Sequence, residues 1–433
     1  MALFSDRLGL IGTENAFKIG PYIREAETAS GRPVIRCNLG EPDFPLPKHI
    51  RDEVHRQIEA GKTHYCDPQG IIPLREAIAK DVGERRGLKI SPDQVVVTAG
   101  AKPPIGFAQQ VYCNPGDEVI YPSPGYPVYE SFTTYLGSKP VPLHLDEARG
   151  FTFDASDLAA LITPRTKLVF MNFPSNPTGG VATKQQLEEM ARVFLAKAPA
   201  DARMFSDEVY ETILFDGALH HSIASVPGMQ KRTIIVSAVS KTYSWTGGRV
   251  GWAVLPTAEE ADAFRNMNIN YYSCLSEYNE WGAKVAIEAP ESRTAIQEMV
   301  TAFQTRRDAT VKALNEIPGV ACRSPKGAFY LFPNISGVCE RVGAVKAFDA
   351  LPETLRSKTS PATLFQLFLL FRHGLATMDR RSFGRIGSEG KHYLRFSIAT
   401  SLEDLKEAVV RFSRAADDNA GLADYVAKGE RLF

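Results

Sequence analysis

The sequence predicts an α/β protein with a large, doubly wound, mostly parallel sheet and a smaller α+β unit. Three observations predict it. Short apolar runs alternate with helical stretches between about residues 90 and 255. Most of these runs are continuous rather than alternating, which is typical of strands covered on both faces. Beyond residue 293, a long helix leads into a segment of short strands and helices. In such sheets ligands bind at the carboxyl ends of strands, so the loops there are the first candidates for a site.

Composition narrows the functional class. The chain has 433 residues, with 50 Lys and Arg against 50 Asp and Glu, so it offers no basic surface for nucleic acid or an anionic membrane. Its six cysteines are scattered, without a CxxC pair or a metal-type cluster, and we expect reduced thiols and no metal centre. The start lacks a signal-like pattern, and the longest apolar run, residues 364–371, is too short for a bilayer. We therefore expect a cytoplasmic protein.

The first 50 residues are expected to form an arm and part of the smaller unit. Moderate helical periodicity covers residues 17–29, and a short strand is expected at residues 33–39. Glycine and prolines stiffen the loop at residues 40–45, which is either a plain turn or a rigid loop beside a ligand. Two helices follow, at residues 47–59 and 73–86, joined by a polar loop that contains Tyr65.

The rest of the chain divides into the sheet and the smaller unit. Residues 51–293 are expected to form the large domain and residues 294–433 the smaller one. We expect sheet strands at residues 94–98, 118–121, 167–171, 204–206, 233–236 and 252–255. In the smaller unit we expect helices at residues 294–317, 363–371 and 402–416, and strands at residues 327–332 and 392–399.

Two motifs follow the first two sheet strands. Gly100, Ala101 and Lys102 open a helix, where free N–H groups and the helix dipole favour a phosphate. A simple helix start explains them equally well. Tyr126 lies among prolines, which would hold its ring rigidly as an aromatic platform.

The next two strand ends carry polar groups. Asn176 belongs to an Asn-Pro-Thr-Gly turn, which is common punctuation but would also present an amide to the crevice. Asp207 and Glu208 follow a strand. Such an acidic pair is usually a helix N-cap; the functional alternative is a buried carboxylate that keeps a ring nitrogen protonated.

Residues 237–252 combine a lysine with an arginine eight residues later. Lys241 lies among small hydroxyl residues, and glycines precede Arg249. This pattern suits a lysine that holds an aldehyde as a Schiff base and an arginine that holds a phosphate. Arg395, in the expected strand at residues 392–399, is on its own most simply a surface or edge-strand arginine.

In their order along the chain, six motifs resemble those of one known family. They are Gly-Glu-Pro-Asp-Phe at 40–44, the loop and helix from Tyr65 to Arg75, Asn-Pro-Thr-Gly at 176–179, Asp-Glu-Val-Tyr at 207–210, Ser-Lys with the later Arg at 240, 241 and 249, and Arg-Phe-Ser-x-Ala at 395–399. Over about residues 10–415 the chain resembles the class I aminotransferases, fold type I of the pyridoxal-phosphate enzymes, and most of all their bacterial aspartate aminotransferase-like branch. That fold has a large sheet domain and a smaller domain built from both termini.

The resemblance implies roles for the cofactor pyridoxal 5′-phosphate. Lys241 would bond covalently to it. Around its ring, Asp207 would pair with the nitrogen, Tyr210 and Asn176 would hydrogen-bond to O3′, and Tyr126 would stack. Its phosphate would be held by Arg249 and by the backbone of Gly100, Ala101 and Lys102. Lys241, Asp207 and Tyr210 would be the catalytic residues. Tyr65 would reach the phosphate from the neighbouring subunit, which implies a homodimer.

The family also implies a reaction and substrate contacts. Amino-group transfer between an L-amino acid and a 2-oxo acid would follow ping-pong kinetics. Arg395 would clamp the substrate α-carboxylate with two parallel hydrogen bonds, Asn176 would assist it, and the Gly40 loop would close over it.

Departures from the family pattern leave the substrate open. Ala238 replaces a serine, so Ser237 or Ser240 is expected to supply the phosphate contact, and Gly248 replaces a tryptophan of many relatives. Residues 377–384 replace a Pro-Gly-x-x-Phe-Gly type of loop near the substrate mouth. That loop is the reason to keep β-elimination or amino-acid oxidation as alternative reactions.

Substrate choice rests on few residues. Lys102 favours aspartate and glutamate, because a bacterial subgroup of aspartate aminotransferases has a lysine there that contacts acidic substrates. Phe17 replaces a small hydroxyl residue of that subgroup, and with Tyr271 and Tyr272 it is a candidate lining for an apolar or aromatic side chain. Arg380 and Arg381 are alternative sources of a distal charge.

Overall fold

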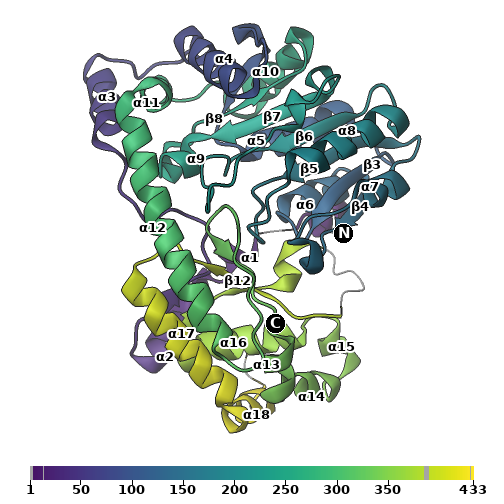
Figure 1. The fold of residues 1–433 in the computed structure, drawn as a ribbon, viewed down its shortest axis with the longest axis vertical. Coiled ribbons are helices and arrows are strands. Elements are labelled where there is room, and N and C mark those ends of the chain that lie inside the picture. Colours follow the sequence, from purple (N-terminus) through teal and green to yellow (C-terminus); the bar gives the residue numbers. More distant parts are fainter. Residues whose placement is uncertain (1–2, 13, 385–389, 430) are drawn as a thin grey trace.

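A seven-stranded sheet forms the centre of the larger part of the molecule (Figure 1). The structure is a computed structural model that describes residues 3–12, 14–384, 390–429 and 431–433. The strand order is β2-β8-β7-β6-β5-β3-β4. Only β8 runs antiparallel to its neighbours, so the predicted mostly parallel sheet is confirmed. The strands are β2 (Val95–Thr98), β3 (Glu118–Ser123), β4 (Lys139–His144), β5 (Thr166–Asn172), β6 (Arg203–Asp207), β7 (Thr233–Ala238) and β8 (Gly251–Val254).

Strand β4 was not predicted from the sequence. It contains Pro140 and Pro142, which interrupt an apolar pattern and lack an N–H for the ladder. The strand lies at the edge of the sheet and pairs only with β3. An edge strand tolerates proline because its outer side has no partner to satisfy.

Helices cover both faces of this sheet. Along β2, Val96 packs in one core with α5 and α10, whereas Val95 and Val97 pack in another with α4. Both faces of the sheet are therefore buried, which explains why the strands are continuous apolar runs. The helices are α3 (Lys48–Glu59), α4 (Ile72–Arg86), α5 (Lys102–Tyr112), α6 (Val128–Tyr135), α7 (Ala155–Leu161), α8 (Lys184–Lys197), α9 (Val239–Thr242), α10 (Ala258–Tyr272) and α11 (Glu277–Glu288).

Helix α12 (Pro290–Asn315) runs from the larger part into the smaller one (Figure 1). There β12 (Leu394–Ser397) lies between β11 (Met378–Asp379) and β9 (Tyr330–Leu331) in an antiparallel sheet. The remaining helices are α13 (Ser336–Arg341), α14 (Ala344–Asp349), α15 (Glu353–Arg356), α16 (Pro361–His373), α17 (Leu402–Asp417) and α18 (Asn419–Ala427).

Both ends of the chain contribute to this smaller part. Strand β1 (Ile35–Arg36) pairs in parallel with β10 (Leu375–Ala376), and α2 (Gly20–Ser30) packs on α16. These contacts support our proposed division of the chain near residues 50 and 293. The single helix expected at residues 17–29 is instead α1 (Asn15–Lys18) and α2, because Pro21 suits the first turn of a new helix.

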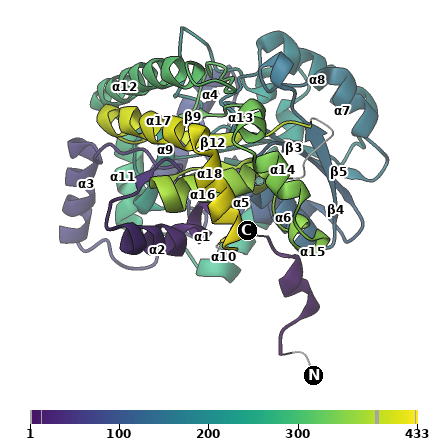
Figure 2. The ribbon, with the colours of Figure 1, turned by 90° about the horizontal axis from the view of Figure 1, so that it is seen from below.

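The N-terminal segment projects away from the body of the molecule (Figure 2). It contains the short 3₁₀ helix η1 (Asp6–Leu10), and its apolar side chains Leu3, Phe4, Leu8 and Leu10 are exposed. Among the described residues, no helix combines the length and apolar character needed to cross a membrane. The cytoplasmic location stays a prediction.

Candidate active site

A cavity of about 430 Å³ lies at the carboxyl ends of the sheet strands, where the smaller part meets the larger. It brings together most of the site residues that the sequence predicted. Those that line it are Phe17, Gly40, Ala101, Lys102, Tyr126, Asn176, Asp207, Tyr210, Ser240, Lys241, Arg249 and Arg395. Gly100 lies beside it, whereas Ser237 and Tyr65 do not line it.

Lys241 lies on the one-turn helix α9, which follows β7 directly. Its Nζ donates to the carbonyl oxygen of Gly40 at 2.5 Å. Burial lowers the pKa of Lys241 to about 8. More of this amine is neutral at neutral pH than in an ordinary lysine, and only a neutral amine attacks an aldehyde.

Asp207 ends β6, and its carboxylate faces the cavity. The Tyr129 hydroxyl donates to its Oδ2 at 2.7 Å. Burial raises the pKa of Asp207 to about 6, so the carboxylate is short of positive charge around it. No helix begins at Asp207 or Glu208, where the chain makes a turn, so the helix N-cap alternative is wrong.

Neighbouring side chains hold this turn in place. Asn172 donates from Nδ2 to the Asp207 carbonyl at 3.1 Å and accepts from the Asn176 N–H at 2.9 Å. The hydroxyls of Tyr210 and Tyr330 lie 2.8 Å apart. Burial holds the pKa of Tyr210 well above its usual value, so its phenol stays protonated. Tyr129, Tyr330 and Asn172 were not predicted from the sequence, although Asn172 ends β5 as other polar candidates end their strands.

Arg395 is only 4% exposed and lies on the central strand of the small sheet, so the surface or edge-strand alternative is wrong. It donates from Nη1 to Asn176 Oδ1 at 2.9 Å, and its guanidinium packs between the rings of Tyr330 and Phe383. Its buried Nε has no hydrogen-bond partner within the described part of the chain. Its Nη2 donates to the carbonyl of Asn38, and the planar guanidinium held in this way suits a planar anion such as a carboxylate.

Arg249 and the start of α5 form a second cationic corner. Arg249 has a left-handed backbone (φ +53°) and donates to the carbonyls of Ala99 and Thr246 at 2.9 and 2.8 Å. Gly100 has a φ of +84°, and a Cβ there would lie 2.4 Å from Arg249 Nη2, so both the backbone and the close arginine favour glycine. Strained backbone beside a helix N-terminus is typical of an anion site. At Gly248, a Cβ would lie 2.3 Å from the Trp245 ring, which explains the small residue there.

Of the two candidate serines, Ser240 and Ser237, only one lies in the cavity. Ser240 lines the cavity, whereas the Ser237 hydroxyl donates to Glu211 at 3.4 Å in a different buried cluster. Strand β7 continues two residues beyond its expected end, to Ala238. Within a strand, successive side chains point to opposite faces, so Ser237 and Ala238 cannot both face the cavity. Ala238 is the one that does.

Several other candidates lie outside the cavity. Tyr65 is 87% exposed, and its side chain reaches no site residue of its own chain. Tyr271 donates to Gln110, and Tyr272 donates to Asn268, so this pair does not line the cavity. Arg380 donates to the Gly384 carbonyl and Arg381 to that of Ser357. These two arginines thus fix the 377–384 loop and supply no charge to the cavity.

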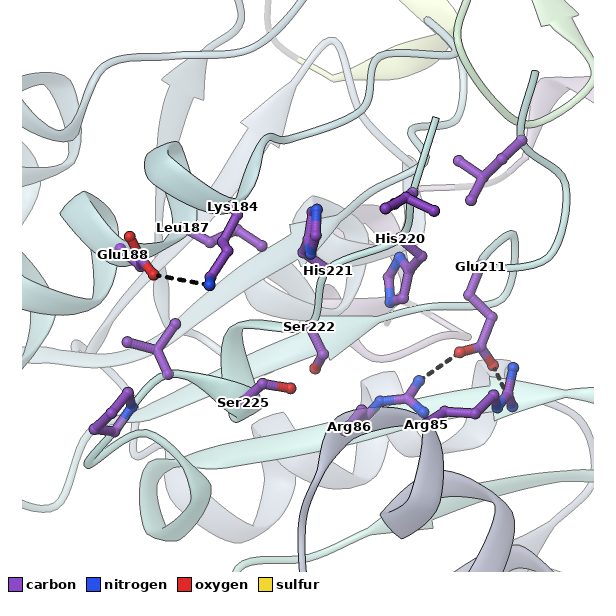
Figure 3. Close-up of a pocket in the computed structure, with 14 residues that line it drawn as sticks. Arg85, Arg86, Lys184, Leu187, Glu188, Glu211, His220, His221, Ser222 and Ser225 are labelled. Atoms are coloured by element: carbon purple, nitrogen blue, oxygen red, sulfur yellow. Dashed lines mark hydrogen bonds and ion pairs between the residues drawn. The ribbon is translucent and has the colours of Figure 1, made fainter. Parts of the chain in front are cut away.

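A second cavity, of about 610 Å³, is lined by Arg86, Glu211 and His220, and Glu211 belongs to the turn after β6 (Figure 3). Arg86 pairs there with both Glu208 and Glu211, and Figure 3 shows its contact with Glu211. Although burial alone would raise it, Arg86 and His220 hold the pKa of Glu208 well below its usual value. Ligand atoms of Glu208, Glu211 and His220 lie within 4.8 Å of one another, but Arg86 takes the position of a cation. We therefore treat this cluster as structural support for the turn.

Comparison with known proteins decides the family. Residues 32–412 match the family model for class I and II aminotransferases. The chain belongs to the class I and II aminotransferases. It is similar to the aspartate/prephenate aminotransferase of Cereibacter sphaeroides, with 35% identity over 95% of this chain and 98% of that protein. It is also similar to aromatic-amino-acid aminotransferase 2 of Thermococcus litoralis, with 33% identity over 96% and 98%.

Solved structures agree with this assignment. The aspartate aminotransferase from Rhizobium meliloti superposes with a TM-score of 0.86 at 33% identity, covering 96% of this chain and 99% of that one. The fold type I architecture and the resemblance to aspartate aminotransferases are thereby confirmed. This aminotransferase accordingly acts on amino acids and 2-oxo acids.

Proposed function

We propose that this aminotransferase uses pyridoxal 5′-phosphate and moves amino groups between an L-amino acid and a 2-oxo acid by a ping-pong mechanism. One observation carries the proposal: Lys241, Asp207 and Arg395 converge on one cavity from three separate elements. The fit to the cofactor is supported by the donor set. A carboxylate short of positive charge suits a protonated ring nitrogen, and the corner at Arg249 suits a phosphate.

In this proposal each group has one task. Lys241 bonds to the cofactor aldehyde, Asp207 pairs with the ring nitrogen, and Tyr210 and Asn176 lie within the same cavity to bind O3′. Tyr126 stacks on the ring. Arg249, Ser240 and the backbone of Gly100, Ala101 and Lys102 hold the phosphate. When bound, the cofactor supplies an electron sink for the negative charge that develops at the substrate Cα.

The chain's own residues then bind the substrate and move its proton. Arg395 binds the α-carboxylate through its planar guanidinium and holds the Cα–H bond near Lys241. Once the substrate amino group has replaced it on the aldehyde, the freed Lys241 amine, whose pKa is lowered by burial, would remove the Cα proton as a general base. The Gly40 loop excludes water at that point, because its carbonyl already contacts Nζ.

We further propose that acidic amino acids are the favoured substrates, with glutamate and 2-oxoglutarate as one pair. Lys102 supports this, because it lines the cavity and no role in binding the α-carboxylate is assigned to it. The names of the relatives include both aspartate and aromatic substrates. Because no residue of the 377–384 loop lines the cavity, we do not propose elimination or oxidation.

A homodimer is the proposed assembly. The exposed Tyr65 ring would reach the phosphate of the partner's cofactor. The exposed apolar side chains of the projecting N-terminal segment, such as Leu3 and Phe4, support an arm that packs on a second copy (Figure 2). Sedimentation should give a dimer for the full chain and a weaker one after Leu3 and Phe4 are both changed to Ser.

The first experiment is the absorption spectrum of the purified protein with excess L-glutamate or L-aspartate and no oxo acid. We expect the visible band of the bound cofactor to convert to that of its amine form and to return with 2-oxoglutarate. Lys241→Ala is the control and should give neither change. If the band is present but no L-amino acid changes it, the transaminase proposal fails while cofactor binding stands. If only aromatic or aliphatic amino acids change it, the preference for acidic substrates is wrong.

A further inference from the structure

Four cationic side chains line the cavity within the described part of the chain: Lys102, Lys241, Arg249 and Arg395. Under the proposed function, Lys241 and Arg249 serve the cofactor and Arg395 serves the α-carboxylate. Lys102 is the cation that remains for the side-chain carboxylate of an acidic substrate. Its surroundings therefore decide how well such a substrate binds.

Lys102 already has a carboxylate partner. Its Nζ forms an ion pair and a hydrogen bond with Oε2 of Glu14, a residue 88 positions earlier in the chain. The Glu14 side chain is only 16% exposed and itself lines the cavity. With burial as the largest cause, Glu14 also contributes to holding the pKa of Tyr126 well above its usual value, so its charge acts inside the site.

The walls beside this pair are apolar. The Lys102 ammonium lies 5.7 Å from the ring centre of Phe17 and 5.9 Å from that of Tyr126. Ala16 and Ile105 also line this side of the cavity. The side-chain subsite thus combines an ion pair with two aromatic rings, so it offers a cation for an acidic side chain and an apolar surface for an uncharged one.

We infer that Glu14 is a specificity-determining residue, whose carboxylate occupies Lys102 where the side-chain carboxylate of an acidic substrate would bind. An acidic substrate has to displace Glu14 from Lys102, whereas an apolar or aromatic side chain leaves the pair intact and packs on the two rings. Glu14 therefore lowers the preference for dicarboxylic substrates and lets one site accept both kinds of side chain. This inference rests on the proposed function, because it takes Arg395 as the α-carboxylate site.

The competition follows from charge. Two carboxylates that share one ammonium repel each other, so either the substrate or Glu14 gives up its contact. Replacing Glu14 with Gln removes the competing carboxylate, so Lys102 can pair with the substrate. The Glu14 side chain makes no capping hydrogen bond to α1, so this replacement leaves the helix start intact.

Equilibrium binding of two inert ligands to the cofactor-loaded protein tests the inference. Succinate is a dicarboxylate and 3-phenylpropionate is a monocarboxylate with an aromatic end; neither has an amino group to transfer. By calorimetry we expect Glu14→Gln to tighten succinate on the order of tenfold and to change 3-phenylpropionate by less than about twofold. Glu25→Gln removes the same charge from an exposed surface pair with Arg431 and should change neither.

A double-mutant cycle localises the effect to Lys102. In a Lys102→Gln background, Glu14→Gln should no longer tighten succinate. The ratio of kcat/KM for glutamate to that for phenylalanine should rise with Glu14→Gln by the same factor as the succinate affinity. Unchanged or weaker succinate binding in Glu14→Gln, or a gain that persists without Lys102, overturns the inference. Failure of the proposed function would look different: no amino acid would convert the cofactor, whatever residue stands at position 14.

Discussion

The Lys241 Nζ donates a hydrogen bond to the carbonyl oxygen of Gly40 at 2.5 Å. This contact joins the helix after β7 to the loop after β1, two segments that are 201 residues apart. The loop is held in turn by Tyr330, since a Cβ on Gly40 would lie 2.1 Å from the Tyr330 hydroxyl oxygen. The loop's distance from the lysine is thus fixed by the absence of a side chain at position 40.

Gly40→Ala should therefore push the loop away from Lys241 and reduce kcat/KM by about tenfold or more. Gly40→Ala with Tyr330→Phe removes the clashing oxygen and should recover part of this loss when each is compared with Tyr330→Phe alone. Gly20→Ala is the control, because a Cβ at that position meets only Arg24 Nη1, at an ordinary contact distance of 3.8 Å. An equal loss in the single and the double variant would show that the clash is not the cause.

The pKa of Lys241 gives a second prediction. Burial lowers it from 10.5 to about 8 in the cofactor-free chain. After reductive ¹³C-methylation of the apoprotein, one lysine NMR signal should titrate near pH 8 and be missing in Lys241→Ala. Because the amine is neutral above its pKa, the reactive form should dominate above about pH 8. A signal of Lys241 that titrates near 10.5 would contradict the role of burial.

The Asp207 carboxylate should lower the stability of the apoprotein although transamination requires it. Its folded pKa of about 6 lies above the ordinary 3.8, so the folded apoprotein binds the extra proton between these values. Stability therefore falls as pH rises through that window, and the full penalty is present above about pH 6. We expect Asp207→Asn to stabilise the apoprotein by about 2–3 kcal/mol at pH 8 and by less at pH 5. The same change should reduce transamination by at least about a hundredfold.

Denaturant unfolding of both apoproteins at the two pH values checks this. Asn still accepts the Tyr129 hydrogen bond, so packing around position 207 stays the same. An Asp207→Asn apoprotein that is less stable than the parent at pH 8 would show that the carboxylate has a positive partner we have not identified.

Arg86 supports the same turn from behind. Arg86→Met leaves Glu208 and Glu211 buried together without their shared cation, and we expect a loss of about 3–5 kcal/mol in the free energy of unfolding. Arg56→Met breaks a pair with Glu53 in which the arginine is exposed to solvent, and it should cost much less. Equal effects of the two changes, measured by urea unfolding, would refute a structural role for the cluster.

The features that could be predicted from the sequence are those determined by residues close together in the chain. Polar groups after apolar strands, such as Asn176 and Asp207, could be found because strand ends and turn residues are close together in the chain. The edge strand β4 was not predicted, because Pro140 and Pro142 usually interrupt a strand. They are tolerated here because β4 lies at the edge of the sheet.

Long-range pairings could not be predicted in this way. Nothing in the chain indicates that Glu14 meets Lys102 or that Tyr129 meets Asp207, because the tertiary fold brings these pairs together. Ser237 was a reasonable candidate as long as the strand was expected to end at residue 236. Its extension to Ala238 changed which residue faces the cavity.

Asp207 and Glu208 are consecutive, yet they serve opposite sides of the sheet: one faces the cavity and the other Arg86. The Glu208 N–H continues the ladder by donating to Val236, so the alternation is set by the pleat. Inserting or deleting one residue within β6 would exchange the two carboxylates and damage the site and its support together. As the gene diverges, the turn at residues 217–219 can gain or lose residues more readily, whereas the length of β6 must be preserved.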